Sequence, residues 1–219
     1  MALDLQQQEE LERVKNIWHG GLKWCVLALL CVALVYLCFV ALRNYRHDKN
    51  EQATDLLVTY QTQMQHKKEA EALETLQILQ NNYANTAAAS IATTTEGILA
   101  FYNGRLTDAQ RHFQWVYDHQ HDEFLHVSAI INLVNVKLSE KKFDEALHLT
   151  DEKVAPELDF LLKDLRGDIY IAKGDEKSAV AAYNRAIAAL PKPNPVVSKE
   201  DIEQIRSQIE AKKITHLTQ

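Results

Sequence analysis

LLKDLRGDIYIAKGDEKSAVAAYNRAIAALPKP, residues 161–193, holds an ordered set of small and aromatic residues. Counted from Gly167, the set comprises Tyr170 at +3, Gly174 at +7, Ala179 at +12, Tyr183 at +16, Ala186 at +19 and Pro191 at +24. An upstream stretch, residues 93–119, uses several of the same offsets. Counted from Gly97, these are Gly104 at +7, Ala109 at +12, Phe113 at +16 and Val116 at +19. The recurrence indicates an internal repeat.

Two weaker copies extend the series. Residues 133–153 keep an alanine, Ala146, and the charged turn before it, and residues 63–83 centre on Ala72. The four alanines, at 72, 109, 146 and 179, are separated by 37, 37 and 33 residues. These separations bracket a repeat of about 34 residues, the length of a two-helix unit.

A helical hairpin explains why these residue types recur. A glycine in the first helix, Gly97 or Gly167, lets the second helix approach closely, and Phe113 or Tyr183 then fills the groove to the next hairpin. Gly104 and Gly174 suit the left-handed residue just past a helix end. The alanines mark where the second helix meets the first. We expect Thr107 and Asp175 to cap the second helices, and Pro191 to end the last one.

The pattern resembles the tetratricopeptide repeat, most closely in residues 167–191. It predicts an all-α protein in which residues 67–190 form an α-solenoid of about four helical hairpins, because single hairpins cannot bury their faces alone. A generic bundle of α-hairpins with coincidental alanines is the alternative interpretation.

The N-terminal region predicts a single membrane-spanning helix over residues 22–43. Its core, Trp24 to Leu42, has nineteen residues without a charge and contains all three cysteines. As a helix this core is about 28 Å long, close to the roughly 30 Å of a bilayer interior. A cleavable signal peptide is disfavoured, because the lead-in is acidic and no small-x-small cleavage site follows. The span leaves residues 1–21 as a separate N-terminal segment.

Three further segments complete the organisation. Residues 44–66 continue from the span as a polar juxtamembrane helix, and residues 191–197 are a stiff proline linker. Residues 198–219 form a C-terminal helix that opens with Ser198 and Asp201 in the manner of a capping box. We expect this helix to cover the end of the solenoid; a dimerising helix is the alternative.

Composition excludes several classes of protein. The chain has only 6 glycines and 4 prolines in 219 residues, too few for the frequent turns of an all-β fold. Its formal net charge of −6 argues against a nucleic-acid partner. The flanks of the span carry three basic residues each, so charge alone does not decide its orientation.

The sequence holds no catalytic motif, so we predict no enzyme activity, no cofactor and no small-molecule substrate. The nearest thing to a metal site is a cluster of histidines and acids around one turn. Its histidines are His112, His119, His121 and His126. Such residues can ligate a metal, but polar residues also collect in turns between helices, and we favour that reading.

Protein binding is the function that remains. The first helices of stacked hairpins line a concave surface. Helical spacing predicts that Tyr102, Asn135, Asp164 and Asp168 face it as partner-binding residues. Ile98 and Phe101 are on the same side, where packing between repeats is the competing role.

The order of parts resembles the ancillary SecYEG translocon subunit family, the YfgM-like proteins of Gram-negative bacteria. EELERVKNIWHGGLKW, residues 9–24, is similar to its pre-membrane segment, and residues 42–61 are similar to its juxtamembrane helix. The strongest stretch is DLRGDIYIAKGDEKSAVAAYNRAI, Asp164 to Ile187. The span departs from the family by being rich in Leu and Cys.

The resemblance implies a bacterial inner-membrane protein with residues 1–21 cytoplasmic and the C-terminal domain periplasmic. Its implied partners are the SecYEG translocon and a membrane-anchored periplasmic chaperone of the prolyl-isomerase type. It would help pass secreted polypeptides to periplasmic chaperones. A repeat scaffold of another envelope complex, for secretion or division, shares every physical feature above and stays open.

Overall fold

The computed structural model describes residues 10, 12, 13, 15, 23–195 and 197–217, and these are all-helical, without strands. Most of the expected N-terminal segment, residues 1–21, therefore lies outside the described residues. The chain divides into two compact units, residues 1–51 and 52–219. Each unit is described by itself.

Helix α2 (Lys23–Gln65) contains the apolar run and is the one helix of the described residues long and apolar enough to cross a membrane. Its large apolar side chains are exposed over that run, with Leu29 at 70% and Phe39 at 60%. An apolar surface of this extent is unfavourable in water and is matched by lipid. The helix therefore has the length, composition and unburied apolar surface of a membrane anchor.

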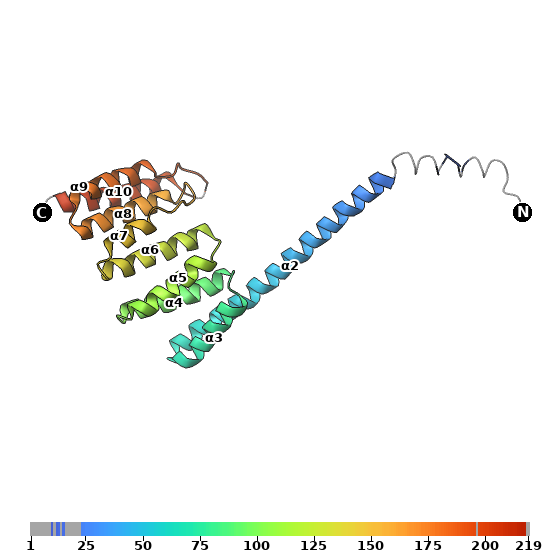
Figure 1. The fold of residues 1–219 in the computed structure, drawn as a ribbon, viewed down its shortest axis with the longest axis horizontal. Helices are drawn as coiled ribbons and strands as arrows, with labels where there is room; N and C mark the ends of the chain where they lie inside the picture. Colours follow the sequence, from blue (N-terminus) through green and yellow to red (C-terminus); the bar gives the residue numbers. More distant parts are fainter. Residues whose placement is uncertain (1–9, 11, 14, 16–22, 196, 218–219) are drawn as a thin grey trace, which may run out of the picture. The chain divides into compact units, whose positions relative to one another are not determined.

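Four hairpins follow one another in the second unit (Figure 1). The first pairs residues 52–65 of α2 with α3 (Glu69–Asn82), since Tyr60 shares a core with Leu76 and Thr75 donates to Gln63. The remaining helices are α4 (Ala87–Tyr102) with α5 (Leu106–His119), α6 (Glu123–Ser139) with α7 (Phe143–Leu149), α8 (Asp159–Lys173) with α9 (Glu176–Ala188), and a final α10 (Lys199–Leu217).

The stacking defines an inner side. Helix α4 contacts α6, and α6 contacts α8, whereas no comparable contact joins α5 to α7 or α7 to α9 in the part of the chain described. First helices that lie closer together than second helices give a stack that curves toward the first helices. We call this side of α4, α6 and α8 the inner face.

All four turns inside the hairpins share one geometry. In each hairpin, the residue seven places after the position equivalent to Gly97 has a positive φ. These residues are Lys67, Gly104, Lys141 and Gly174, with φ of +58°, +74°, +59° and +81°. In each turn the next amide donates across the helix end, as from Arg105 to the Ala100 carbonyl at 2.8 Å. This Schellman arrangement satisfies carbonyls at the end of each first helix.

Helix starts are capped at several points. Asp175 accepts a hydrogen bond from the Ser178 amide, as its position predicted. The prediction for Thr107 is wrong: α5 begins at Leu106 after Arg105, which makes no side-chain cap. After the tight turn at Gly104 the helix starts two residues earlier than predicted, which places Thr107 inside its first turn.

Helix α10 closes the stack. Ser198 and Asp201 form the capping box: the Asp201 amide donates to Ser198 Oγ at 3.1 Å, and the Ser198 amide donates to the Asp201 carboxylate at 3.0 Å. Ile209 is 3% exposed and packs in a core with Phe160 and Tyr183. The helix thus covers the apolar end of the last hairpin.

Candidate protein-binding surface

Two glycines bring the helices of their hairpins close together. A Cβ added at Gly97 would lie 2.6 Å from the Phe113 ring, and one at Gly167 would lie 2.3 Å from the Tyr183 ring. Both rings are buried. Each aromatic side chain therefore fills the space that its glycine leaves.

The repeat alanines occupy equivalent, closely packed positions in the second helices. Ala72, Ala109, Ala146 and Ala179 are each 0% exposed. They lie in α3, α5, α7 and α9, one in each hairpin. The irregular spacing of these alanines in sequence thus corresponds to one regular position in space.

The first hairpin reverses the sizes at the glycine and aromatic positions. Twelve residues before Ala72, where the glycine is expected, stands Tyr60; sixteen residues after Tyr60, where the aromatic is expected, stands Leu76. Both are buried in one core. The large side chain comes from the first helix instead of the second, which is why this copy is faint in the sequence.

Residues at the end of the solenoid take two kinds of position. Tyr170 is half-buried against the core shared by α8, α9 and α10, with the Arg166 guanidinium 6.0 Å from its ring centre. Pro191 is half-buried, two residues past the C-cap Ala189 of α9. Both lie where the last hairpin meets α10 and the linker.

The predicted partner-binding residues separate into two groups. Tyr102 is 82% exposed at the end of α4, and Asn135 is exposed on α6. Asp164 and Asp168 of α8 are instead bound by Lys212 of α10, whose Nζ lies 2.7 Å and 2.9 Å from their carboxylates.

One cluster of interacting side chains contains Lys212, Asp164, Asp168 and Tyr183. Tyr183 donates to Asp168 at 2.8 Å, and the Lys212 ammonium lies 5.9 Å from the Tyr183 ring centre. Burial raises the pKa of Asp164 despite the hydrogen bond from Lys212. Burial alone would lower the pKa of Lys212, but the hydrogen bonds to both carboxylates outweigh it and leave that pKa raised. The sequence analysis did not predict the ion pairs of Lys212, because a helical pattern does not determine which carboxylate a lysine side chain will contact.

Ile98 and Phe101, for which packing between repeats competes with partner binding, differ in their exposure. Ile98 is 38% exposed, whereas Phe101 is half-buried against a core that includes Ala109 and Phe113. Ile98 thus remains accessible on the inner face while Phe101 contributes mainly to packing.

The histidines take up separate roles. His119 lies against Trp115, with Nδ1 2.8 Å from the Trp115 carbonyl, and His126 Nε2 is 3.1 Å from Glu152. Burial lowers the pKa of His112, and the charge of the neighbouring Arg111 adds to this. Within the described residues, no group of three or more histidine, cysteine or acidic side chains is arranged to hold a metal ion.

Glu152 joins three elements at this place. It accepts a hydrogen bond from Tyr117 at 2.6 Å in addition to the His126 contact, and so links α5, α6 and the loop before α8. The hydrogen bond to Glu152, followed by burial, raises the pKa of Tyr117 to about 12. No motif or spacing in the sequence predicts this contact.

Four stacked hairpins with a common turn and a common buried alanine define a tetratricopeptide-like solenoid. The model of the tetratricopeptide repeat-like domain family matches residues 15–207. A curated relative, the ancillary SecYEG translocon subunit of Neisseria gonorrhoeae (strain ATCC 700825 / FA 1090), is 30% identical over 192 residues, which cover 87% of this chain and 92% of the relative. The chain belongs to the ancillary SecYEG translocon subunit family. No solved structure matches it.

Proposed function

We propose that this protein is a membrane-anchored scaffold that binds other polypeptides at the SecYEG translocon. The observation that carries the proposal is the similarity to an ancillary SecYEG translocon subunit, which extends over 87% of the chain. The exposed part of the inner face, with Tyr102 and Asn135, provides a surface for polypeptides. A non-catalytic scaffold needs no more than an anchor and such a surface.

The finer proposal concerns topology and partners. Residues 1–21 face the cytoplasm, residues 22–43 span the bacterial inner membrane, and the solenoid lies in the periplasm. There it contacts a membrane-anchored chaperone of the prolyl-isomerase type and helps hand secreted polypeptides to periplasmic chaperones. The absence of cysteine from residues 43–219 supports a periplasmic location, where stray thiols are a liability.

Affinity purification tests the translocon association. The tagged full chain is produced at near-native level and extracted in mild detergent, beside an equally tagged single-span membrane protein as control. We expect SecYEG and the prolyl-isomerase-type chaperone with this chain and not with the control. Recovery of a different envelope complex without SecYEG would favour the alternative scaffold.

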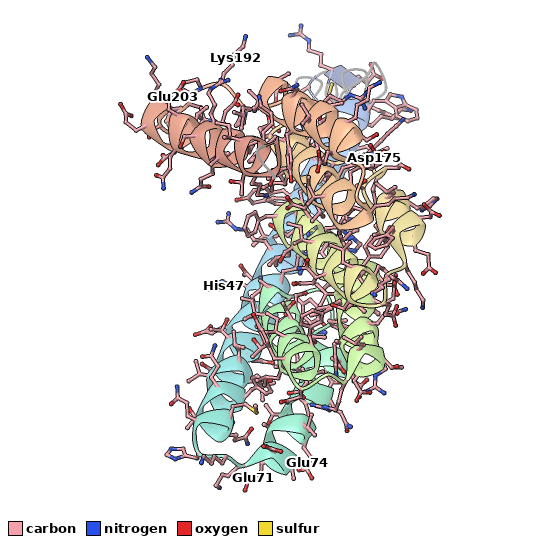
Figure 2. The ribbon with its side chains drawn as sticks, turned by 90° about the vertical axis from the view of Figure 1, so that its left-hand side faces the viewer. His47, Glu71, Glu74, Asp175, Lys192 and Glu203 are labelled. Carbon is pink, nitrogen blue, oxygen red and sulfur yellow. The ribbon has the colours of Figure 1, made fainter. Side chains whose placement is uncertain are left out.

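Thiol labelling tests the topology. Lys192 and Glu203 are exposed near one end of the hairpin stack, far from Glu71 and Glu74 of α3 at the other end (Figure 2). Lys192→Cys and Glu203→Cys are made after replacing the three native cysteines of α2. A membrane-impermeant reagent should label both positions in cells with a permeable outer membrane. Labelling only after inner-membrane rupture would contradict a periplasmic solenoid.

A further inference from the structure

Equivalent positions on the inner face can be compared across three hairpins. The residues fifteen and eleven places before each buried alanine are Thr94 and Ile98 on α4, Ile131 and Asn135 on α6, and Asp164 and Asp168 on α8. These six residues differ sharply in charge, since only α8 is acidic. The same helix face therefore offers different chemistry along the stack.

On α8 this face is already in contact with a helix of the same chain. Helix α10 places Lys212 against Asp164 and Asp168, and its Ile209 packs beside Tyr183. The contact shows that the face accepts a polypeptide helix. It also shows that the incoming side chain is matched to it in charge: a lysine meets two carboxylates.

Helix α4 has no exposed, unpaired charged side chain on its inner face. Its only charged side chain in sixteen residues is Glu96, which is 8% exposed. Glu96 accepts a hydrogen bond from Tyr60 at 3.3 Å and lies 3.8 Å from Arg105. The exposed side of α4 is consequently uncharged.

The ionisable groups of α6 are likewise engaged within the protein. Glu123 accepts a hydrogen bond from the Ala155 amide at 2.9 Å, and His126 contacts Glu152. Lys137 pairs with Glu145 at 2.8 Å, and its side chain is only 12% exposed. Within the described residues, neither central first helix presents an unpaired charge to a ligand.

Apart from uncharged polar residues such as Asn135, the side chains that the two helices present are apolar. Ile91, Ile98 and Tyr102 follow one side of α4 at spacings of seven and four residues, and they are 40%, 38% and 82% exposed. Phe124, at the start of α6, is 64% exposed. Burying an exposed apolar group of this size contributes about 25 cal/mol per Å² removed from water.

We propose that the inner face of α4 and α6 binds an uncharged, apolar segment of an unfolded polypeptide. The charge matching seen on α8 supports this occupant, because uncharged positions match uncharged side chains. An acidic peptide would meet no unpaired cation of α4 or α6 here, and the nearby Arg105 is already paired with Glu96 and Asp108. Desolvating the carboxylates of such a peptide would therefore be poorly compensated. This inference rests on the proposed function and specifies the class of polypeptide that the scaffold holds.

Site-specific photo-crosslinking tests it on the full chain in lipid nanodiscs. A photoreactive phenylalanine analogue replaces Tyr102 or, as a matched control on a second helix, Ile78, which is 44% exposed. The probe is a capped fluorescent peptide of Leu, Ile, Ser and Asn, about ten residues and thus up to about 35 Å long. The comparison peptide carries Asp at every second position.

We expect the neutral probe to crosslink at position 102 about tenfold more than at 78, and the acidic probe about tenfold less than the neutral one, a difference of about 1.4 kcal/mol. Ile98→Asp should reduce crosslinking at 102 by a similar factor, while Ile78→Asp should leave it unchanged. Equal yields at both positions, or preference for the acidic probe, would overturn the proposal.

Two outcomes separate this inference from the proposed function. If SecYEG co-purifies with the Ile98→Asp chain but the wild-type chain gives no crosslink at 102, the peptide site is wrong and the translocon association stands. If light scattering shows a dimer that Ile98→Asp dissociates, the face is an interface between two copies, which also overturns the peptide site.

Discussion

Gly167→Ala provides the sharpest test of how a hairpin is held together. The added methyl carbon would stand 2.3 Å from the Tyr183 ring, a distance that real contacts do not allow. The ring cannot yield easily, because Tyr183 is 1% exposed and its hydroxyl is bonded to Asp168 at 2.8 Å. Either the ring moves and weakens that bond, or α8 and α9 separate.

The magnitude follows from three opposing effects. Overpacking a core costs about 1–3 kcal/mol, and weakening a hydrogen bond to a charged group can cost about 1.5 kcal/mol more. Alanine in place of glycine inside a helix returns about 1 kcal/mol. We therefore expect a net loss of about 2 kcal/mol, which lowers Tm by about 4–8 °C in a chain of this size.

Thermal unfolding of the full chain in mild detergent, followed by circular dichroism, measures the effect. Ala172→Gly, at an exposed position of the same helix, calibrates the helix-propensity contribution separately. In a Tyr183→Leu background the clash is removed, so Gly167→Ala should become neutral or stabilising by up to about 1 kcal/mol. A Gly167→Ala chain as stable as wild type, or an equal loss in both backgrounds, would refute the packing argument.

Three further outcomes are expected. Lys141→Gly should raise stability by about 0.5 kcal/mol in the same assay, because Lys141 has φ of +59°, a conformation that costs other L-residues about 1 kcal/mol; a loss would contradict this. Lys212→Met should be destabilising at pH 7, with a deficit that shrinks as the pH falls and Asp164 becomes protonated: burial raises the pKa of Asp164, so stability is lost as pH rises through that pKa, and more so without the lysine; a pH-independent deficit would count against it. Glu152→Gln should lower the pKa of Tyr117 from about 12 toward its ordinary value, read by carbon NMR of the tyrosine ring, and an unchanged pKa would contradict the Glu152 contact.

The repeat could be predicted where its residues have special backbone or volume requirements. Glycine at 104 and 174 reports a left-handed turn, and alanine at 109 and 179 reports close helix packing, so these copies were visible. The turns at Lys67 and Lys141 have the same geometry without glycine. Their lysines look like ordinary surface residues, and the turn is held instead by the hydrogen bonds across the helix end.

The candidate surface was predictable only in part. Helical spacing placed Tyr102 and Asn135 on an exposed side, because it depends on local geometry alone. It could not foresee that Lys212 would meet Asp164 and Asp168, since that contact joins residues more than forty apart and depends on how α10 lies. The charge distribution along the inner face is likewise a property of tertiary contacts, which pair Glu96 and Lys137 with partners elsewhere in the chain.

The first helix of the first hairpin is formed by the last fourteen residues of α2, and the earlier part of the same helix is the apolar run. Proteolytic cleavage after residue 65 would consequently release an incomplete solenoid that lacks its first helix. It would strip Ala53 and Tyr60 from their core and uncover Leu76 and Leu79, now buried at 2% and 0% exposure. The released fragment would expose these apolar side chains at one end. Cleavage at this place would therefore favour aggregation or degradation of the fragment.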